Sequence, residues 1–318
     1  MVEARTEGEL AEAVRSAYEP LLVLAGGSNV VIADEGFPGT VARVLTRGIE
    51  RDGARLVVQA GESWDELVQR CVAEGLQGFE CLSGIPGSVG ATPIQNVGAY
   101  GQEVAETVVS VRVLDRASGQ IEELPAKACG FSYRSSVFKY RDRRVVLAVT
   151  FELNEDIRSG PLRYAELARA LDVPVGGTAP LAEVREAVLA LRRGKGMVID
   201  PADPDSVSAG SFFTNPILEP HEFALLQARA GDGSPPAFPE PDGRIKTSAA
   251  WLIQNAGFAR GYGNGRVGIS TKHTLAIVNR GGATTAELVA FAREIAGGVR
   301  ERFGIALHPE PVFVGHDW

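Results

Sequence analysis

The first half of the chain is dominated by runs of residues that are typical of strands. Short stretches rich in apolar and β-branched residues predict buried strands. They are LLVL (21–24), RLVVQA (55–60), VVSVRVLD (108–115) and VVLAVTFEL (145–153). The first run stops at Gly26-Gly27, which predicts a turn directly after a strand.

Helices are predicted between some of these strands. Thr6 and Glu9 have the spacing of a capping box, and Ser63 and Glu66 repeat that spacing before a second helix. The apolar positions that follow each cap recur at helical spacing. They are Leu10, Val14 and Ala17 in the first helix, and Trp64, Leu67, Val68, Cys71 and Val72 in the second.

The character of the sequence changes after about residue 155. A predicted helix near 181–193 leads into GKGMVIDPADPD, a connector rich in Gly, Pro and Asp. The predicted elements of a second unit follow: a helix around SAAWLIQNAG, a strand at TLAIVN (274–279), a helix capped by Thr284 and Glu287, and a final apolar strand, PVFV. The pattern predicts an α+β protein in two main parts, without an internal repeat.

Composition and charge narrow the class of protein. The chain has 318 residues, enough for two or three units with their own cores, and its 45% hydrophobic and 23% charged residues are typical of a globular protein. A net charge of −8 argues against a broad nucleic-acid face but permits one small anionic ligand. The acidic start lacks the apolar core of a signal peptide, and no apolar run approaches the roughly 20 residues of a membrane helix. We therefore expect a cytoplasmic protein without nucleic-acid or membrane partners.

Cysteine and histidine patterns give no indication of a metal site or a disulfide framework. Cys71, Cys81 and Cys129 are few and widely spaced, so they are predicted to be reduced thiols in the core. The four histidines show no H-E-x-x-H motif, and we expect no bound metal.

A glycine-rich segment occupies the centre of the first half. Seven glycines fall within the 27 positions from Gly75 to Gly101, where Glu80 is the single charged residue. Glycine lets backbone N–H groups crowd around a ligand without a Cβ in the way, so this nearly neutral segment predicts a loop that wraps an extended anion such as a diphosphate. The alternative is a surface loop with several turns.

A second glycine turn in VLAGGSNVVI follows a strand directly, which suggests dinucleotide binding. However, the G-x-G-x-x-G spacing is absent, and so is an acidic residue on a second strand about 20 positions further on. GYGNGRVG (261–268) is rich in glycine but follows no strand. Two separated turns rich in amides therefore indicate a fold other than the Rossmann fold.

One hydroxyl in SAGSFFTNP (208–216) is a candidate for chemistry. Ser211 lies between small residues and Phe212-Phe213, which would suit a reactive group shielded from water, but an ordinary turn before Asn215-Pro216 explains the same stretch. The sequence lacks G-x-S-x-G around Ser211 and a triad pattern around its histidines, which disfavours a serine nucleophile.

Three charged residues each allow two interpretations. Glu310 lies between two prolines in HPEPVFVG, either as a carboxylate held on a stiff segment or in a plain chain-end turn. Arg134 in FSYRSSVFKY either binds an anion or lies at a solvated strand edge. Lys195 in RRGKG either binds an anion or complements the dipole of a helix end. Local patterns do not separate these alternatives.

Taken in order, several segments resemble the UDP-N-acetylenolpyruvoylglucosamine reductase (MurB) family. They are LAGGSNVVI, LSGIPGSVGATPIQNVGAYGQEV, CGFSYRSSVFK, AGSFFTNP, AAWLIQNAGF, KHTLAIVN and HPEPVFVG. These segments are spread over most of the chain, from about residue 21 to 315, and the glycine-rich and serine-containing motifs are highly specific.

The resemblance implies an α+β flavoprotein with the FAD-binding fold of the vanillyl-alcohol-oxidase type. In such a protein NADPH reduces FAD, and hydride then passes to the enolpyruvyl ether of a UDP-sugar, giving UDP-N-acetylmuramate for peptidoglycan. The implied partners are this substrate and NADPH, and the implied state is a monomer. The implied parts are an FAD-binding region at 1–155 (lobes of about 1–48 and 49–155), a helical connector with a substrate loop at 156–199, a substrate-binding domain at 200–305, and a tail at 306–318 that returns to the active site.

The family's functional residues carry over to matching positions of this sequence. Ser211 matches the proton donor, and Arg134 and Glu310 match the pair that polarises the enolpyruvyl carboxylate and its enol intermediate. Substrate-binding positions correspond to Tyr133, Tyr164, Lys195, Asn215 and His273, although the family often has glutamine at the last of these. Flavin-binding positions correspond to Gly26, Gly27, Ser28, Asn29, Ser83, Gly84, Pro86, Gly87, Gly90, Ala91, Gly98, Ala99, Tyr100 and Gly101.

Several points stay open at this level. Glu310 could donate to the enediolate if protonated, or could orient Arg134. The family usually begins with a segment that ends near Thr-x-x-x-Gly-Gly, and this sequence starts after it, so we expect an opening strand and some flavin contacts to be absent. Two other hypotheses are a flavin oxidase of the related superfamily, which lacks the pairing of AGSFFTNP with HPEPVFVG, and a catalytically silent nucleotide-sugar-binding protein.

Overall fold

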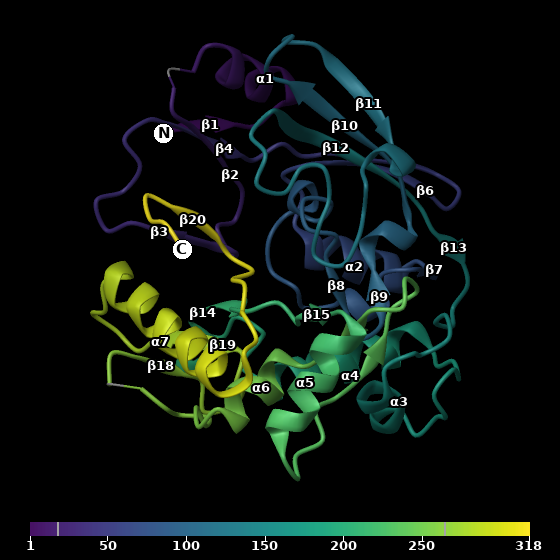
Figure 1. Cartoon of the computed structure of the whole chain (residues 1–318). Helices are drawn as coiled ribbons and strands as arrows, with labels where there is room; N and C mark the ends of the chain where they lie inside the picture. Colours follow the sequence, from purple (N-terminus) through teal and green to yellow (C-terminus); the bar gives the residue numbers. More distant parts are fainter. Residues whose placement is uncertain (18, 264) are drawn as a thin grey trace. The chain divides into compact units, whose positions relative to one another are not determined.

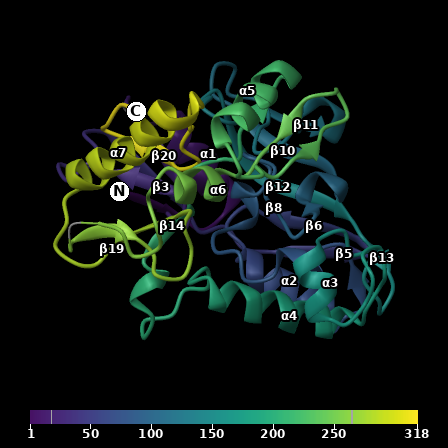
Figure 2. The same cartoon turned by 60° about the horizontal axis from the view of Figure 1, so that its bottom comes forward.

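The computed structural model describes residues 1–17, 19–263 and 265–318, and the chain divides into two compact units. Unit 1 comprises residues 1–27 and 37–193, and unit 2 comprises residues 28–36 and 194–318. Figures 1 and 2 show the elements of both units from two sides. The short segment 28–36 thus belongs with the C-terminal part of the chain, which the sequence pattern did not indicate. The domain limits expected from the resemblance stay a prediction.

Unit 1 is built around an antiparallel sheet of five strands in the order β11-β10-β12-β6-β5. Every residue from Val145 to Phe151 in the middle strand is buried, so this strand is covered on both faces. That burial explains why its sequence is a continuous apolar run rather than an alternating one. The strands are β5 (Ile49–Asp52), β6 (Arg55–Gln59), β10 (Val108–Asp115), β11 (Ile121–Pro125) and β12 (Arg144–Glu152).

Smaller elements complete unit 1. A parallel sheet of order β1-β4-β2 packs against helix α1, and two short antiparallel pairs join β7 to β13 and β8 to β9. The strands are β1 (Val2–Ala4), β2 (Leu21–Leu24), β4 (Thr40–Val44), β7 (Leu76–Gln77), β8 (Gly98–Ala99), β9 (Gln102–Glu103) and β13 (Asn154–Glu155). The helices are α1 (Glu7–Arg15), α2 (Trp64–Ala73), α3 (Ala165–Ala170) and α4 (Leu181–Gly194).

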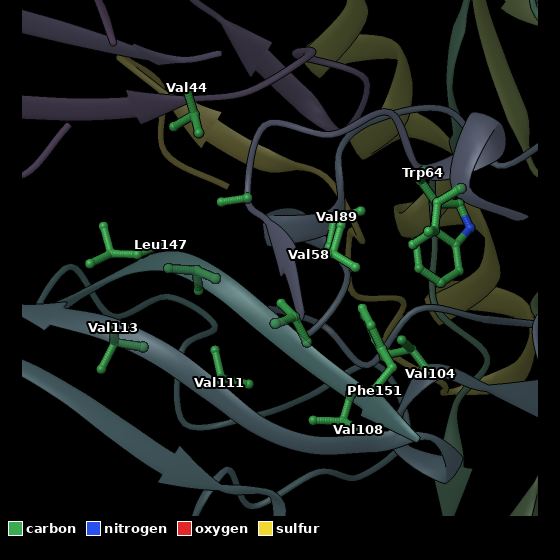
Figure 3. Close-up of a cluster of buried hydrophobic side chains, with 14 of the residues drawn as sticks. Val44, Val58, Trp64, Val89, Val104, Val108, Val111, Val113, Leu147 and Phe151 are labelled. Atoms are coloured by element: carbon green, nitrogen blue, oxygen red, sulfur yellow. The ribbon is translucent and has the colours of Figure 1, made fainter. Parts of the chain in front are cut away.

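The core of unit 1 joins the large sheet to helix α2. Trp64 packs edge-on against Phe79 with 4.9 Å between ring centroids, and Phe79 packs edge-on against Phe151 at 5.0 Å. Figure 3 shows Trp64 and Phe151 among the valines of this cluster. The indole Nε1 of Trp64 donates to the carbonyl oxygen of Leu82 at 3.2 Å. The Trp64 side chain therefore fills the core and also fixes the backbone at Leu82, within the glycine-rich segment.

Unit 2 contains an antiparallel sheet of order β14-β19-β18, against which the long helix α7 packs (Figures 1 and 2). A second small sheet has the order β15-β17-β16. The strands are β14 (Ser208–Ser211), β15 (Ile217–Leu218), β16 (Phe238–Pro239), β17 (Ile245–Lys246), β18 (Val267–Ile269) and β19 (Ala276–Asn279). The helices are α5 (Pro220–Ala230), α6 (Ala249–Asn255) and α7 (Thr285–Phe303).

The segment 28–36 is held in unit 2 by the C-terminal strand. β3 (Val30–Ile32) pairs in parallel with β20 (Val312–Val314). At the start of α7, the N–H of Thr285 donates to Asp34 at 2.8 Å and its hydroxyl donates to the carbonyl of Ile32 at 2.7 Å. The predicted flavin turn Gly26–Asn29 is therefore divided, since Gly26 and Gly27 end a segment of unit 1 and Ser28 and Asn29 begin a segment of unit 2.

Most predicted elements are confirmed. β2, β6, β10, β12, β19 and β20 lie within two residues of the predicted strands, and α2, α4, α6 and α7 occur where helical spacing predicted them. Helix α1 ends at Arg15, so Ala17 lies beyond it, contrary to the pattern. The three cysteines are free and buried, as predicted. Among the described residues, no helix combines the length and apolar character that crossing a membrane requires.

Two of the three capping predictions are confirmed. The N–H of Glu9 donates to the Thr6 hydroxyl at 3.2 Å and the N–H of Thr6 donates to the Glu9 carboxylate at 3.2 Å; Thr284 and the acid three residues later form the same box on α7. The prediction for Ser63 is wrong in one respect. Ser63 is the N-cap residue of α2, but its side chain makes no capping hydrogen bond, and its backbone instead pairs with Ser88 of the glycine-rich loop.

This contrast predicts different costs for two similar substitutions. Thr6→Ala is expected to lower the free energy of unfolding by about 1 kcal/mol, because the Glu9 amide loses its side-chain acceptor. Ser63→Ala, also in unit 1, is expected to stay within about 0.5 kcal/mol of the unsubstituted protein. Denaturant unfolding followed by circular dichroism measures both, and equal losses would contradict the assignment of the caps.

Candidate active site

Two glycine turns from distant parts of the sequence come together in unit 1. A Cβ added to Gly26 would lie 3.5 Å from the Cα of Gly87. Gly27, Gly84 and Gly87 have φ values of +73°, +71° and +110°, where L side chains are strained. The two backbones thus approach closely in conformations that favour glycine, which fits a cofactor such as FAD that is held largely by main-chain groups.

The glycine-rich loop is fastened to the chain that leads into helix α2. The N–H of Trp64 donates to the carbonyl of Gly87 at 3.0 Å, and the N–H of Gly90 donates to the carbonyl of Ala60 at 2.9 Å. The amide of Gly84 donates to Asp65 at 2.6 Å. These bonds give the loop a defined shape, and they use amides that the sequence suggested would face an anion.

Neighbouring positions of the loop also have structural partners. Ser83 is buried, and its hydroxyl donates to the carbonyl of Glu80 at 2.8 Å. The N–H of Ala91 donates to the carbonyl of Ser88 at 2.9 Å. Pro86, between Gly84 and Gly87, is exposed. The burial of this segment contradicts the alternative of a plain surface loop, since Val89 and Gly90 are also buried.

Gly90 is the position where the loop approaches a strand most closely. A Cβ added there would lie 2.5 Å from the Cβ of Ala60 and 3.0 Å from its Cα, so the loop would have to shift. Gly90→Ala is expected to destabilise the protein by about 1–3 kcal/mol and to weaken FAD binding. Gly160→Ala is the matched control, because no atom lies within 4 Å of the added Cβ and its φ is not positive. Flavin fluorescence quenching and thermal unfolding measure both effects, and equal behaviour of the two variants would contradict the prediction.

Arg134 lies at the far end of the glycine-rich loop. Its guanidinium donates to the carbonyl of Gly98, at 2.6 Å from Nη2, and its Cζ lies 5.1 Å from the centre of the Tyr133 ring. Arg134 has a φ of +51°, an uncommon value for a residue other than glycine. Strained backbone of this kind is concentrated at functional sites. The structure thus brings a predicted catalytic residue to a predicted flavin-binding strand, β8, which also contains Ala99.

Asn96 is a structural residue of the site that the sequence analysis missed. It is buried, with a φ of +45°, and its amide nitrogen donates to Glu103 at 2.7 Å and to the carbonyl of Ser132 at 3.2 Å. Its side-chain oxygen accepts from the amide of Ala105 at 3.1 Å. Asn96 therefore fastens the glycine-rich loop to the segment that carries Arg134. The tolerance of asparagine for positive φ was the available signal.

Two predicted ligand-binding tyrosines meet in unit 1. The rings of Tyr100 and Tyr164 pack edge to face, with 5.4 Å between their centroids. Burial raises the pKa of Tyr100 to about 12, so its hydroxyl stays protonated at neutral pH. Tyr164 precedes α3 and is 44% exposed. Gly101, with a φ of +83°, approaches the side chain of Arg163, which precedes Tyr164.

In unit 2, backbone hydrogen bonds pair the motifs that contain Ser211 and Glu310. The N–H of Glu310 donates to the carbonyl of Phe212 at 2.8 Å, and the N–H of Thr214 donates to the carbonyl of His308 at 3.0 Å. The side chain of Asn29 donates to the carbonyl of Glu310 at 3.5 Å. The structure therefore brings together three chain segments predicted to serve catalysis or flavin binding.

The strand that carries Ser211 is irregular immediately before it. Ser211 pairs with Ala276 of β19, but the register of β14 shifts between Ser208 and Ser211, and Gly210 has a φ of +77°. Irregularities of this kind redirect a side chain and are common next to active sites. The glycine in SAGS thus permits the irregular backbone geometry before Ser211.

The two phenylalanines after Ser211 form an aromatic cluster. Phe212 and Phe213 are each 1% exposed, and their ring centroids are 5.1 Å apart. Trp318 packs against both, at 6.3 Å and 5.8 Å, and Phe313 of β20 packs against Phe212 at 6.2 Å. These rings support the Ser211 strand by packing, and the part played by Trp318 was not predicted.

Lys195 and His273 lie in segments that both contact Asp205. A Cβ on Gly196 would lie 3.0 Å from the carbonyl oxygen of Asp205, and the buried Asp205 carboxylate accepts hydrogen bonds from the amide, at 3.1 Å, and the hydroxyl of Thr271. The sequence pattern predicts that Asp205 belongs to a connector. It lies instead where the Lys195 and His273 segments meet.

The remaining predicted substrate residue has a structural partner. The side-chain oxygen of Asn215 accepts from the amide of Ala249 at 3.0 Å, at the start of α6. Predicted catalytic residues are thus divided between the units, with Arg134 in unit 1 and Ser211 and Glu310 in unit 2. Across the described parts of the chain, no group of three or more His, Cys, Asp or Glu side chains is placed to hold a metal ion.

Comparisons with known proteins indicate the family of the chain. Residues 201–314 match the family described as UDP-N-acetylenolpyruvoylglucosamine reductase, C-terminal domain, and residues 1–125 match the family described as FAD binding domain. The UDP-N-acetylenolpyruvoylglucosamine reductase of Thermobifida fusca is 60% identical over 307 residues, which cover 93% of this chain and 86% of the relative. That of Salinispora arenicola is 58% identical over 326 residues, covering 99% and 90%. The crystal structure of the MurB enzyme from Thermus caldophilus has a TM-score of 0.67 at 26% identity and covers 98% of this chain and 91% of that one.

Proposed function

Because the chain belongs to the UDP-N-acetylenolpyruvoylglucosamine reductase family, we propose that it reduces UDP-N-acetylenolpyruvoylglucosamine to UDP-N-acetylmuramate with NADPH. The enzyme is an FAD-containing oxidoreductase of peptidoglycan synthesis. The observation that carries the proposal is 60% identity over 93% of the chain to a reductase of this name. The pairing of the Ser211 and Glu310 motifs through Phe212 supports it.

The glycine turns fit FAD. Gly26, Gly27, Gly84 and Gly87 would line one part of the cofactor site, since their backbones approach each other without side chains between them. Gly98 to Gly101 would line another, close to Arg134. FAD held by these residues would supply the hydride chemistry that links NADPH to the β carbon of the enolpyruvyl ether.

Arg134 stabilises the negative charge that develops on the substrate. Addition of hydride to the β carbon places electron density on the α carbon and the adjoining carboxylate, as an enediolate. A guanidinium can bind that carboxylate through two charge-assisted hydrogen bonds. The bond to Gly98 and the positive φ hold Arg134 in one conformation before substrate binds, which lowers the cost of reorganisation during the reaction.

Ser211 completes the reduction by giving a proton to the α carbon. The hydroxyl O–H bond breaks, the new C–H bond forms, and the serine oxygen regains a proton from water or from a neighbouring acid. Glu310 either donates a hydrogen bond to the enediolate or orients Arg134. Tyr133, Tyr164, Lys195, Asn215 and His273 would bind the UDP-sugar.

The proposal also includes the oligomeric state and the cellular location of the protein. The enzyme acts as a monomer in the cytoplasm, and its net charge of −8 supports the expectation that it has no nucleic-acid partner. Size-exclusion chromatography with light scattering tests the monomer, and a dimer mass would reject it.

The proposed function is tested by the absorbance spectrum of the purified protein. A yellow protein is expected whose flavin spectrum bleaches with NADPH under anaerobic conditions and returns when the enolpyruvyl substrate is added, with UDP-N-acetylmuramate as the product by mass spectrometry. Absence of bleaching would favour a silent nucleotide-sugar-binding protein. Rapid reoxidation by oxygen without turnover of the substrate would favour a flavin oxidase. Either result would reject the proposed function.

A further inference from the structure

A single carboxylate ties three segments of unit 1 together beside the predicted flavin site. Asp65, in the first turn of α2, accepts a hydrogen bond from the amide of Gly84 at 2.6 Å. It also accepts two from the guanidinium of Arg185 in the middle of α4, at 2.7 Å and 2.9 Å. The two side chains thus form the parallel, bidentate geometry that makes arginine–carboxylate pairs strong. The start of α2, the Gly84 turn and α4 are therefore joined at one point.

This pair is only partly exposed to water. The Arg185 side chain is 11% exposed and the Asp65 side chain 35%. Burial raises the pKa of Asp65, but the hydrogen bonds from Arg185 and from the Gly84 amide outweigh it and hold the pKa below the ordinary value. Asp65 is therefore ionised at neutral pH, and removing the guanidinium of Arg185 would leave this carboxylate uncompensated in a partly buried place.

The pair lies against the part of the loop that meets the other glycine turn. Gly84, with its positive φ, is three residues from Gly87, which approaches Gly26. An anionic carboxylate here would repel a phosphate group bound nearby, unless a cation neutralised it. Arg185 supplies that cation, and its two parallel hydrogen bonds also fix the orientation of the Asp65 carboxylate.

Helix α4 brings a second arginine to the same loop. Arg192 is seven residues after Arg185 and therefore lies on the same side of the helix. Burial lowers the pKa of Arg192, while Tyr100 and Asp65 oppose that shift. Helix α4 thus lies against both ends of the glycine-rich loop, at Gly84 through the Asp65–Arg185 pair and at Tyr100, which packs against the cluster containing Val184 and Val188 of α4.

We propose that Asp65 and Arg185 are a positioning pair for FAD. Asp65 sets the conformation of the Gly84 turn, and Arg185 neutralises Asp65 so that this turn can accept an anionic part of the cofactor. The inference rests on the proposed FAD-dependent function. Neither residue is assigned contact with reacting atoms, so their expected effect is on cofactor affinity rather than on the chemical steps.

The pair is tested by titrating FAD into flavin-free protein and following the quenching of flavin fluorescence. Arg185→Met is expected to weaken FAD binding at least tenfold, because it leaves the Asp65 charge uncompensated beside the turn. Asp65→Asn is expected to weaken it less, since the neutral amide can still accept from Gly84. The double variant Asp65→Asn/Arg185→Met is expected to bind FAD more tightly than Arg185→Met alone, because the uncompensated charge is gone.

A second ion pair in unit 1, in which only the acid is buried, serves as the control. Asp115 is fully buried and accepts from Arg143 at 2.7 Å and from the amides of Ala117 and Ser118. Asp115→Asn is expected to lower the melting temperature of the flavin-free protein while leaving FAD affinity unchanged. The pair would be merely structural, and the proposal overturned, if Arg185→Met bound FAD within twofold of the unsubstituted protein, or if Asp115→Asn lost as much affinity.

Two further results keep the test decisive. If Arg185→Met does not fold, Asp65→Asn decides, and unchanged FAD affinity in that variant overturns the proposal. Failure of the unsubstituted protein to bind FAD would reject the proposed function itself, whereas the positioning role fails only when that protein binds FAD and the variants match it.

Discussion

Ser211→Ala is expected to lower the rate of product formation by about 10²–10⁴-fold while leaving reduction of the flavin by NADPH intact. The reason is that the two half-reactions need different groups. Hydride transfer from NADPH requires the cofactor site, whereas the α carbon of the substrate requires a proton after hydride has arrived at its neighbour. Ser211 ends β14 at an irregular position next to the Glu310 segment, and removal of one oxygen leaves the backbone pairing of both segments unchanged.

Anaerobic stopped-flow absorbance separates the two half-reactions for this variant. The bleaching phase is expected at the rate of the unsubstituted enzyme, and the return of colour with substrate is expected to slow. Ser208→Ala on the same strand is the matched control and is expected to keep near-normal turnover, since its hydroxyl accepts a long hydrogen bond, of 3.3 Å, from the Gly210 amide. Turnover of Ser211→Ala within a few-fold of the unsubstituted enzyme would show that another group delivers the proton.

A thiol at the same position refines this prediction. Ser211→Cys is expected to keep more turnover than Ser211→Ala, because a thiol is a stronger acid than an alcohol and can still transfer a proton. If the two variants were equally slow, the serine would act by placing the substrate or a water molecule rather than by giving its own proton.

Local patterns in the sequence predicted the elements well because the interactions that form them are local. The run at 108–115 became a strand with those limits, since alternating and β-branched residues favour a pleated backbone whatever the partner strand is. The caps at Thr6 and Thr284 involve residues three apart, so their spacing was visible. The Ser63 side chain makes no capping hydrogen bond, and its backbone pairs with a distant segment at Ser88, which local spacing does not show.

The contacts that shape the candidate site are long-range, which is why the sequence did not reveal them. Asp65 and Arg185 are 120 positions apart, and an acid in the first turn of a helix already has a sufficient local explanation in the helix dipole. Asn96 contacts Ser132 from 36 positions away. Residues 28–36 belong to unit 2, where β3 pairs with β20, a strand at the other end of the chain. Composition and periodicity carry no information on such pairs.

The glycines show where pattern and geometry agreed only in part. Their density predicted a loop that wraps an extended anion through its main chain, which stays a prediction. The structure shows that the loop folds closely against other backbone, as Gly87 does against Gly26, and that the amides of Gly84, Gly90 and Ala91 donate to oxygens of the protein. The glycines of this loop allow its backbone to fold compactly. Because several of its amides donate to the protein, only some of the loop's amides can bind a ligand.

Glu310→Leu is expected to lower turnover by about 10²–10³-fold, the usual effect of losing one group that stabilises an oxyanion. Glu310→Gln is expected to lose about tenfold less, because its amide N–H can still donate a hydrogen bond to the enediolate oxygen. The backbone of residue 310 is held by Phe212 and by Asn29, so neither substitution should disturb the pairing of the two motifs. Any difference between the variants therefore reports on the side chain.

The comparison of Gln with Leu at position 310 decides between the two roles left open for this residue. A carboxylate that orients Arg134 must be charged, and both neutral substitutions would then lose turnover to the same extent. A protonated acid that donates to the enediolate is imitated by Gln and not by Leu. Because donation acts on charge that exists only after hydride transfer, the Gln and Leu variants should also bind substrate alike and differ in kcat. Equal kcat values with a raised KM in both would assign Glu310 to substrate binding and reject its role in the chemical step.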